Sequence, residues 1–205
     1  MKRKLPLFIE RSLGDMHVSR LALASEFEHD IRSEKKISCK SGCAECCYHP
    51  VLISVLEGIF LYRWFAEHGR WTPSFRQSLE KFSKTTTGLA FEVWAITHIP
   101  CPLLTSKNEC SAYEARPLTC RTTFSTGNPH YCHTHRIGPD TGFVNRVEVL
   151  SKFHVREVEL LKRYNLFHML FNVGKAMLLA EKVCNGTIDL EDVNQEYVRG
   201  LEKTA

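Results

Sequence analysis

Residues 39–47 read Cys39-Lys40-Ser41-Gly42-Cys43-Ala44-Glu45-Cys46-Cys47, which places four cysteines within nine positions. A second stretch carries four more cysteines, Cys101, Cys110, Cys120 and Cys132. Thiolate is a soft ligand that selects zinc, cuprous copper or iron–sulfur clusters, and this density of sulfur is typical of a shared metal site. We therefore predict that these eight cysteines are metal ligands. Cys184 lies on a predicted helix and is interpreted as a small core residue.

The adjacent pair Cys46-Cys47 bears on the choice of metal. Four thiolates complete either a tetrahedral zinc or an iron–sulfur cluster with one sulfur on each corner iron. Neighbouring side chains usually point in different directions, so the pair fits two metals, or two irons, better than one mononuclear ion. A redox pair is the remaining reading. The sequence therefore favours an iron–sulfur cluster and leaves zinc as the alternative cofactor.

The bulk composition is that of an ordinary globular chain, with 205 residues, of which 43% are hydrophobic and 24% charged. A chain of this length can bury a core without disulfide staples, so chemistry must explain its cysteines. The formal net charge is +4, and the positive residues are scattered, so no nucleic-acid or membrane-binding patch is indicated. No apolar run approaches the roughly 18 residues of a membrane span.

The first ten residues imitate an export signal only in their basic start. Pro6 breaks the apolar stretch that follows and Glu10 ends it, so the stretch is shorter than an export signal requires. We therefore expect a cytoplasmic protein. In that compartment disulfides are disfavoured, and clustered cysteines bind metals or carry out redox chemistry.

Helical periodicity dominates the chain outside the cysteine-rich stretches and predicts a mainly α fold. A first helix is expected near residues 16–35. Its apolar face would consist of Val18, Leu21, Ala24, Phe27 and Ile31. Ser54 and Glu57 form a capping box for a second helix that runs to about His68, with Gly69 as its stop.

A third helix is expected to begin at Thr72-Pro73, a cap followed by the first helical position, with an interruption near residues 85–88. Its apolar positions would be Phe75, Leu79, Phe82, Leu89, Val93 and Ile96. From Phe143 the helical pattern returns. Two helices are expected around residues 150–161 and 166–184, and a short last helix around residues 190–201.

Residues 100–142 hold five prolines and four cysteines, and this composition predicts a loop-rich segment that a metal would stabilise. The expected architecture is a small helical bundle in which a loop-rich cysteine metal-binding region joins two segments. We expect residues 1–142 to form the metal-binding domain and residues 143–205 a helical segment that packs on it. The helices between the two cysteine groups would bring both groups to one end of the bundle.

The cysteine spacing and one further stretch resemble a known family. That stretch reads Cys110-Ser111-Ala112-Tyr113-Glu114-Ala115-Arg116-Pro117-Leu118-Thr119-Cys120-Arg121. Over residues 39–132 the chain resembles the CxxCxxCC zinc- or iron-chelating domain family, the YkgJ-like cysteine-cluster proteins, although Cys39 and Cys43 are one residue further apart than the family name implies. The resemblance implies bound zinc or iron–sulfur. One branch of the family is similar to flagellin lysine N-methylases, which adds methyl transfer from S-adenosylmethionine to the alternatives.

Three histidines lie close to the last clustered cysteine. If Cys132 is not a ligand, His130, His133 or His135 could replace it, because zinc accepts imidazole as readily as thiolate. For any one of these histidines taken alone, a solvated loop is the commoner explanation.

Arg116 and Tyr113 lie within the stretch that carries the resemblance. Pro117 biases Arg116 toward an extended backbone, from which its guanidinium could pair with Glu109 or Glu114, or face a thiolate. Tyr113 is expected to shield the site from water. A scaffold role for these side chains is slightly favoured over a catalytic one.

Three functions remain in competition. The leading hypothesis is a metal-binding protein whose iron–sulfur centre carries out redox or cofactor-assisted chemistry on an unknown substrate. The second is a structural zinc module that presents a helical surface to a protein partner. Its surface would be the charged face Arg146, Glu148, Lys152, Arg156 and Glu159. The third is radical S-adenosylmethionine chemistry, which the three-cysteine spacing allows but which the predicted helix before the motif and the missing βα alternation disfavour.

Overall fold

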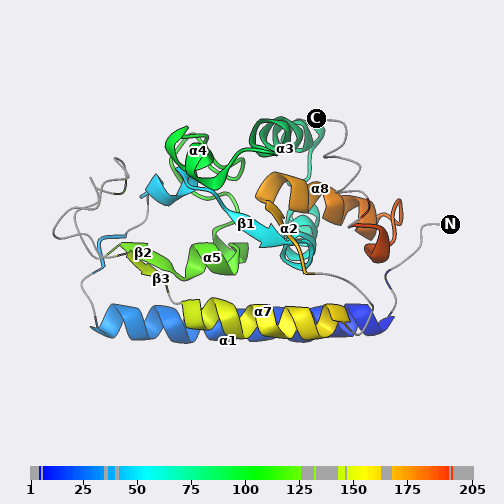
Figure 1. Cartoon of the computed structure of the whole chain (residues 1–205), viewed down its shortest axis with the longest axis horizontal. Helices are drawn as coiled ribbons and strands as arrows, with labels where there is room; N and C mark the ends of the chain where they lie inside the picture. The colour runs from blue at the N-terminus through cyan, green and yellow to red at the C-terminus, as the bar shows by residue number, and fades with distance from the viewer. Residues whose placement is uncertain are drawn as a thin grey trace. The chain divides into compact units, whose positions relative to one another are not determined.

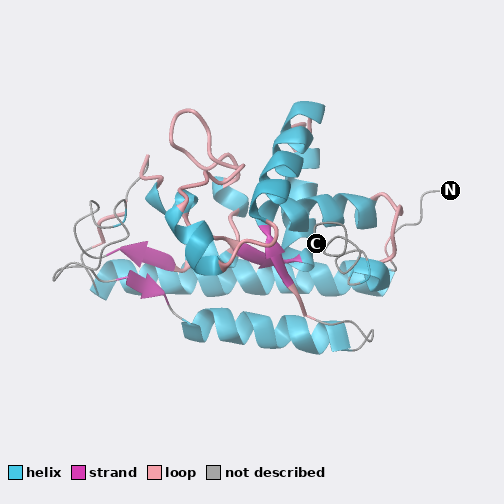
Figure 2. Ribbon diagram, turned by 45° about the horizontal axis from the view of Figure 1, so that its top comes forward, coloured by secondary structure: helices cyan, strands magenta, loops and turns pink. Residues whose placement is uncertain are grey.

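The computed structural model describes residues 5, 7–34, 37–39, 42–125, 132, 143–145, 147–162, 168–193 and 195. Helices dominate these residues, and the strands among them form two short antiparallel pairs, which confirms the mainly α prediction (Figures 1 and 2). None of the helices in these ranges combines the length and the apolar character that a membrane crossing needs.

The backbone divides into two compact units, each assembled from separate stretches of chain. The first, which we call the helical unit, comprises residues 1–17, 52–88 and 154–205. The second, which we call the cysteine unit, comprises residues 18–51 and 89–153. The sequence predicted two domains that each consist of one continuous stretch, with a boundary between residues 142 and 143. That boundary stays a prediction.

The helical unit is built on three helices, α2 (Val55–Glu67), α3 (Pro73–Thr86) and α8 (Val173–Cys184). Both α2 and α3 pack against α8. Strand β1 (Leu52–Ser54) leads into α2, strand β4 (Leu170–Asn172) leads into α8, and the two strands pair antiparallel (Figure 2). In this pairing Ser54, which precedes α2, lies opposite Leu170, and Asn172, which precedes α8, lies opposite Leu52, so the two helices start at opposite ends of the strand pair.

Long apolar side chains fill the interior of the helical unit. Those with 1% exposure or less include Ile53, Leu56, Ile59, Leu61, Leu79, Val173, Met177 and Leu179. The α2–α8 contact is close at Gly58, where an added Cβ would lie 2.6 Å from the carbonyl oxygen of Ala176. Since a Cβ cannot approach a backbone atom this closely, glycine is required at this crossing.

Local end signals set the helix boundaries of this unit, as the sequence predicted. The Ser54 hydroxyl accepts a hydrogen bond from the Glu57 amide and caps α2, and Thr72 with Pro73 begins α3 in the same way. Gly69 has a φ of +64°, a left-handed conformation that suits glycine at the end of a helix. Helix α3 ends at Thr86, within the interruption that was expected.

The helix predicted for residues 16–35 begins earlier than expected, because α1 spans Leu7–Glu34. The buried stripe of α1 consists of Leu13, Met16, Arg20, Ala24 and Phe27. The prediction that Val18 lies on the apolar face is wrong, since Val18 is 67% exposed. Arg20 also lies on this buried stripe, and because it is charged, the apolar periodicity of the sequence did not identify it.

Two further expectations differ from the structure. Helix α4 (Phe91–Ile96) leaves Val93 and Ile96 exposed, so neither lies on a buried face. Phe143 does not start a helix, because strand β3 (Phe143–Asn145) pairs with β2 (Thr123–Ser125), and α7 (Val147–Lys162) follows it. Three-residue strands form through distant partners, and local periodicity does not reveal them.

The helix expected around residues 166–184 starts later than predicted, because Leu170–Asn172 form strand β4 and α8 begins at Val173. Helix α8 ends at Cys184, where Gly186 has a φ of +68°. Of the last predicted helix, the structure describes a short 3-10 turn, η3 (Leu190–Asp192). The predicted helix positions at residues 166 and 196–201 lie outside the described residues.

Candidate metal centre

The first cysteine group lies on and beside a single 3-10 turn, η1 (Glu45–Tyr48). Gly42, with a φ of +80°, directs the chain toward Cys43. The amide of Cys47 donates to the carbonyl oxygen of Ala44 over 2.8 Å and closes the turn. A glycine is needed here because side-chain-bearing residues rarely adopt a positive φ.

The second cysteine group begins with a closed loop. The amide of Thr105 donates to the carbonyl of Glu109, and the amide of Ser111 donates to the carbonyl of Leu103 over 2.7 Å. Cys110 pairs with Leu104 as an isolated antiparallel bridge. This pairing returns Cys110 to the neighbourhood of Cys101, at the start of the same loop.

Cys120 lies on the short helix α5 (Leu118–Arg121), which follows the 3-10 turn η2 (Tyr113–Ala115). Pro117 stands at the N-cap of α5, and its carbonyl accepts from the amide of Arg121. Leu118 is buried and fixes one side of this turn. The Arg-Pro-x-x-Cys-Arg stretch is therefore a single helical turn that presents Cys120.

Backbone hydrogen bonds join the remote cysteine stretches directly. The amide of Cys101 donates to the carbonyl of Cys47 over 2.7 Å, which ties the second group to the first. The amide of Ser125 donates to the Cys39 sulfur over 3.2 Å, and the amide of Ser38 donates to the Ser125 carbonyl over 2.8 Å. Two segments more than fifty residues apart in the chain thus meet within one unit.

The cysteine sulfurs lie close enough to perturb one another. Burial raises the pKa of Cys101 to about 12, and it also raises the pKa values of Cys110 and Cys120. A charge on Cys46 raises all three further. Thiols with raised pKa values hold their protons at neutral pH, and a metal ion must displace those protons when it binds.

Cys46 and Cys47 form a hydrogen-bonded pair. The Cys47 thiol donates to the Cys46 sulfur, which together with the charge of Arg116 lowers the pKa of Cys46 to about 7. The same hydrogen bond, with burial, raises the pKa of Cys47. The two sulfurs therefore lie within hydrogen-bond reach, closer than the expected divergence of neighbouring side chains.

The sulfurs fall into two overlapping neighbourhoods. Burial raises the pKa of Cys39, and charges on three other cysteines raise it further. These are Cys43, Cys46 and Cys132. The hydrogen bond with Cys46 and burial are the main causes of the raised pKa of Cys47. Charges on Cys46, Cys101 and Cys120 raise it further. Cys46 belongs to both sets, so the two cysteine groups influence one another within the cysteine unit, although among the described residues no three of these sulfurs lie within 4.8 Å of one another.

Cys184 belongs to the helical unit, and its interpretation as a core residue stays a prediction. It lies at the end of α8 in the helical unit, where burial raises its pKa and Arg63 opposes that effect. His130, His133 and His135 lie outside the described residues, so their alternative role as ligands stays a prediction.

Amide groups and cations surround the sulfurs. The amides of Leu103, Ala112 and Ser125 donate to the sulfurs of Cys101, Cys110 and Cys39. Hydrogen bonds to sulfur stabilise thiolate charge and tune metal–thiolate centres. The chemistry of these sulfurs fits a soft metal, and the assignment of all eight cysteines as ligands stays a prediction.

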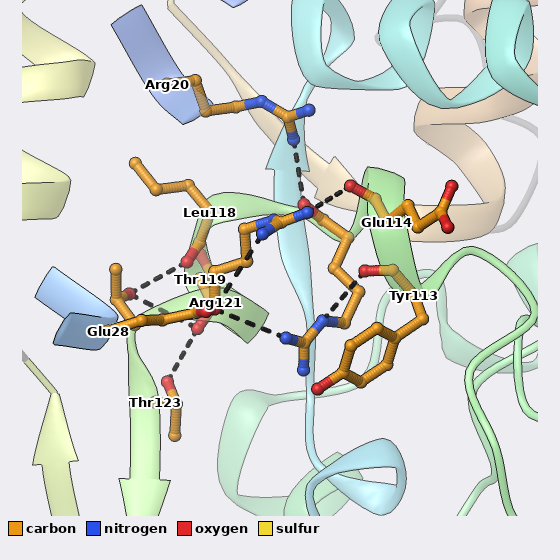
Figure 3. A network of polar contacts seen from close by, with 10 residues as sticks. Arg20, Glu28, Tyr113, Glu114, Leu118, Thr119, Arg121 and Thr123 are labelled. Atoms are coloured by element: carbon orange, nitrogen blue, oxygen red, sulfur yellow. Dashed lines mark hydrogen bonds and ion pairs between the residues drawn. The ribbon is translucent and has the colours of Figure 1, made fainter. Parts of the chain in front are cut away.

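Arg116 and Arg121 are fixed by partners that the sequence did not indicate (Figure 3). The carboxylate that pairs with both is Glu28 of α1, at 3.5 Å from Arg116 and 3.9 Å from Arg121, instead of Glu109 or Glu114. Arg20, which has no exposed surface, donates to the carbonyl of Arg116 over 2.9 Å. A charged residue, Arg20, on the otherwise apolar buried stripe of α1 was the available signal.

Tyr113 contacts Arg116 in this network. The guanidinium of Arg116 lies 3.9 Å from the centre of the Tyr113 ring, and its Nε donates to the Tyr113 carbonyl. Tyr113 remains 55% exposed. The ring therefore holds the arginine in place, and the charge of that arginine contributes to the lowered pKa of Cys46 and partly offsets the raised pKa of Cys110.

The comparisons with known proteins agree with this geometry. A family model described as "CxxCxxCC: Putative zinc- or iron-chelating domain" matches residues 38–141, just over half of the 205 residues. No curated protein and no solved structure matches the chain. The matched range contains all eight clustered cysteines and excludes α8 with Cys184. The chain therefore belongs to the CxxCxxCC family of zinc- or iron-chelating domains.

Proposed function

We propose that the protein is a metal-binding protein in which the eight clustered cysteines hold an iron–sulfur centre. The proposed activity is redox or cofactor-assisted chemistry on a substrate that remains to be identified. Zinc bound at the same cysteines, in a structural module for protein interaction, is the second candidate.

The observation that carries the proposal is the direct hydrogen bond between Cys101 and Cys47. It places two remote cysteine stretches side by side, so sulfurs from both can reach a common centre. A disulfide framework is the main competing explanation for clustered cysteines, and all nine cysteines are free thiols here. Free thiols in this number are typical of metal ligands in a reducing compartment, which supports a cytoplasmic location.

A polynuclear centre, of which an iron–sulfur cluster is one form, is favoured over a single zinc ion because the sulfurs outnumber the ligands of one ion. A single structural zinc takes four ligands, and eight thiols in overlapping neighbourhoods exceed that requirement. An iron–sulfur centre would supply one-electron chemistry at a potential set by hydrogen bonds to sulfur and by solvent exposure. The chain's own residues contribute the amides that face Cys39, Cys101 and Cys110 and the positive charge of Arg116.

Oxygen-free purification followed by metal and acid-labile sulfide analysis tests the proposal. We expect a brown protein with iron, sulfide and charge-transfer absorbance in the visible region, and a paramagnetic resonance signal after reduction or oxidation. A colourless protein with stoichiometric zinc and no sulfide would refute the iron–sulfur version and support the zinc module. A protein that binds neither metal would refute both.

Methyl transfer is the weaker alternative. The described residues form helices and two short strand pairs, and α1 precedes the first cysteine, whereas radical S-adenosylmethionine enzymes place that motif in βα alternation. Calorimetric titration with S-adenosylmethionine tests any remaining route. Heat with a saturating isotherm would support methyl transfer, and no heat at high concentration would count against it.

A further inference from the structure

A second group of metal-ligand side chains lies in the helical unit, outside the family match. It consists of His154 and Glu157 on α7 and His168 just before β4. One ligand atom from each of the three side chains lies within 4.8 Å of the others. The rings of His154 and His168 are 5.1 Å apart, and His168 Nε2 lies 3.0 Å from Glu157 Oε2.

The fold places these three side chains together for identifiable reasons. His154 and Glu157 are three residues apart, so they share one face of α7. In the pairing of β1 with β4, Ser54 lies opposite Leu170, two residues after His168. The Ser54 hydroxyl donates to Glu157 Oε1 over 2.5 Å, which connects the α7 carboxylate to the strand pair.

Glu157 is the central group because its side chain has no exposed surface. A buried carboxylate is costly unless cations or hydrogen-bond donors compensate its charge. Ser54 satisfies Oε1 and is itself fixed as the cap of α2, so Oε2 is left to face His168. This is the arrangement of a ligating carboxylate oriented by a hydrogen bond from a surrounding residue.

The donor set differs in chemistry from the cysteine group. Two imidazoles and one carboxylate are borderline to hard ligands, and three protein ligands with an open position are typical of mononuclear zinc or ferrous sites. Burial lowers the pKa of His154, which favours the neutral ring that a metal requires. Ligands of one tetrahedral ion lie about 3.4 Å apart, so one pair is already at that range and modest side-chain rotation closes the others.

We propose that His154, Glu157 and His168 bind one divalent transition ion of the zinc type, independently of the cysteines. The site leaves coordination positions for water or a substrate group. A dication there would offset the buried charge of Glu157.

The test uses the full chain, stripped of metal under reducing conditions and titrated with Zn²⁺ and separately with Co²⁺. We expect His154→Ala, Glu157→Gln and His168→Ala each to bind one equivalent less than the unaltered chain. Their thiolate-to-cobalt charge-transfer absorbance should stay unchanged, because the cysteines are intact. His68→Ala is the matched control, since His68 is an exposed histidine of the same unit, and it should bind as the unaltered chain does.

Two results would overturn the proposal. Equal metal binding by the unaltered chain and the His154→Ala variant would show that His168 and Glu157 form only an ion pair. Loss of thiolate absorbance in the same variants would show that the missing ion belonged to the cysteines. If Glu157→Gln does not fold, His154→Ala decides alone, because its ring is only half-buried. Absence of thiolate absorbance in every protein would contradict the proposed function. The difference of one metal equivalent between the unaltered chain and the variants would still test the present proposal.

Discussion

The helical unit and the cysteine unit are stabilised by different kinds of interaction. In the helical unit, α2, α3 and α8 are each three or more turns long and bury large apolar side chains such as Leu56 and Met177. Full burial of one such side chain contributes about 1.5–3 kcal/mol. This unit therefore has the usual hydrophobic basis for its stability.

The cysteine unit uses shorter elements around its sulfurs. Helix α5 and the turns η1 and η2 have at most four residues each, and the side chains buried beside them include the small residues Ala44 and Ala112. Polar cross-links such as Arg20 to Arg116 hold these segments. The cysteine unit also buries apolar side chains such as Leu118 and Phe124, and the proposed metal–thiolate bonds would add to the stability that this burial provides.

Removal of the metal should produce the largest difference in behaviour between the two units. Chelation under reducing conditions is expected to abolish amide protection in residues 101–121, while α2 and α8 remain protected. Structural zinc binding supplies on the order of 10–16 kcal/mol, which is lost on removal. Hydrogen exchange followed by mass spectrometry on the full chain measures this. Unchanged protection of residues 101–121 would contradict the idea that metal stabilises this segment.

Loss of one ligand should have the next largest effect. Cys43→Ser and Cys120→Ser are expected to lower bound metal and to reduce the free energy of unfolding by more than about 4 kcal/mol, as for other lost metal sites. Cys184→Ser is the matched control and should change neither quantity. Metal analysis and chemical denaturation provide the measurements. Equal metal loss from all three variants would show that the ligand assignment is wrong.

The packing of the helical unit can be broken without touching the cysteines. Gly58→Ala would place a Cβ 2.6 Å from the Ala176 carbonyl, and overpacking of this kind costs about 1–3 kcal/mol. Gly14→Ala is the matched control, because no atom lies within 4 Å of the added Cβ. The control should stabilise the chain by up to about 1 kcal/mol, since alanine favours helix. Metal content should be unchanged in both, and metal loss in Gly58→Ala would argue against separate stabilisation.

The smallest effect concerns reactivity in the metal-free chain. A thiol with its pKa lowered to about 7 is half ionised at neutral pH, so Cys46 should be alkylated before Cys101, whose pKa is about 12. The rate at Cys46 should rise with pH and level off above its pKa. Cys47→Ala removes the hydrogen-bond donor, raises the pKa of Cys46 and should slow alkylation at pH 7 severalfold. Peptide mapping measures the rates, and an unchanged rate would exclude the sulfur–sulfur hydrogen bond.

Much of the fold could be predicted because its signals are local. Ser54, Thr72 and Gly69 mark helix ends through contacts with residues only a few positions away, and all three predictions are confirmed. The cysteine spacing and the stretch from Cys110 to Arg121 resemble a metal-chelating family, and the family match confirms this resemblance. Thiolate selects soft metals whatever the surrounding fold, so this inference needed no coordinates.

The tertiary structure alone decided which distant residues meet. Glu28 and Arg20 lie on a helix far in sequence from Arg116, and His168 joins Glu157 only through the β1–β4 pairing. Periodicity reports which face of a helix is buried, but not which partner covers it. The free energy of such contacts comes from chain segments brought together by folding, so no local pattern in the sequence encodes them.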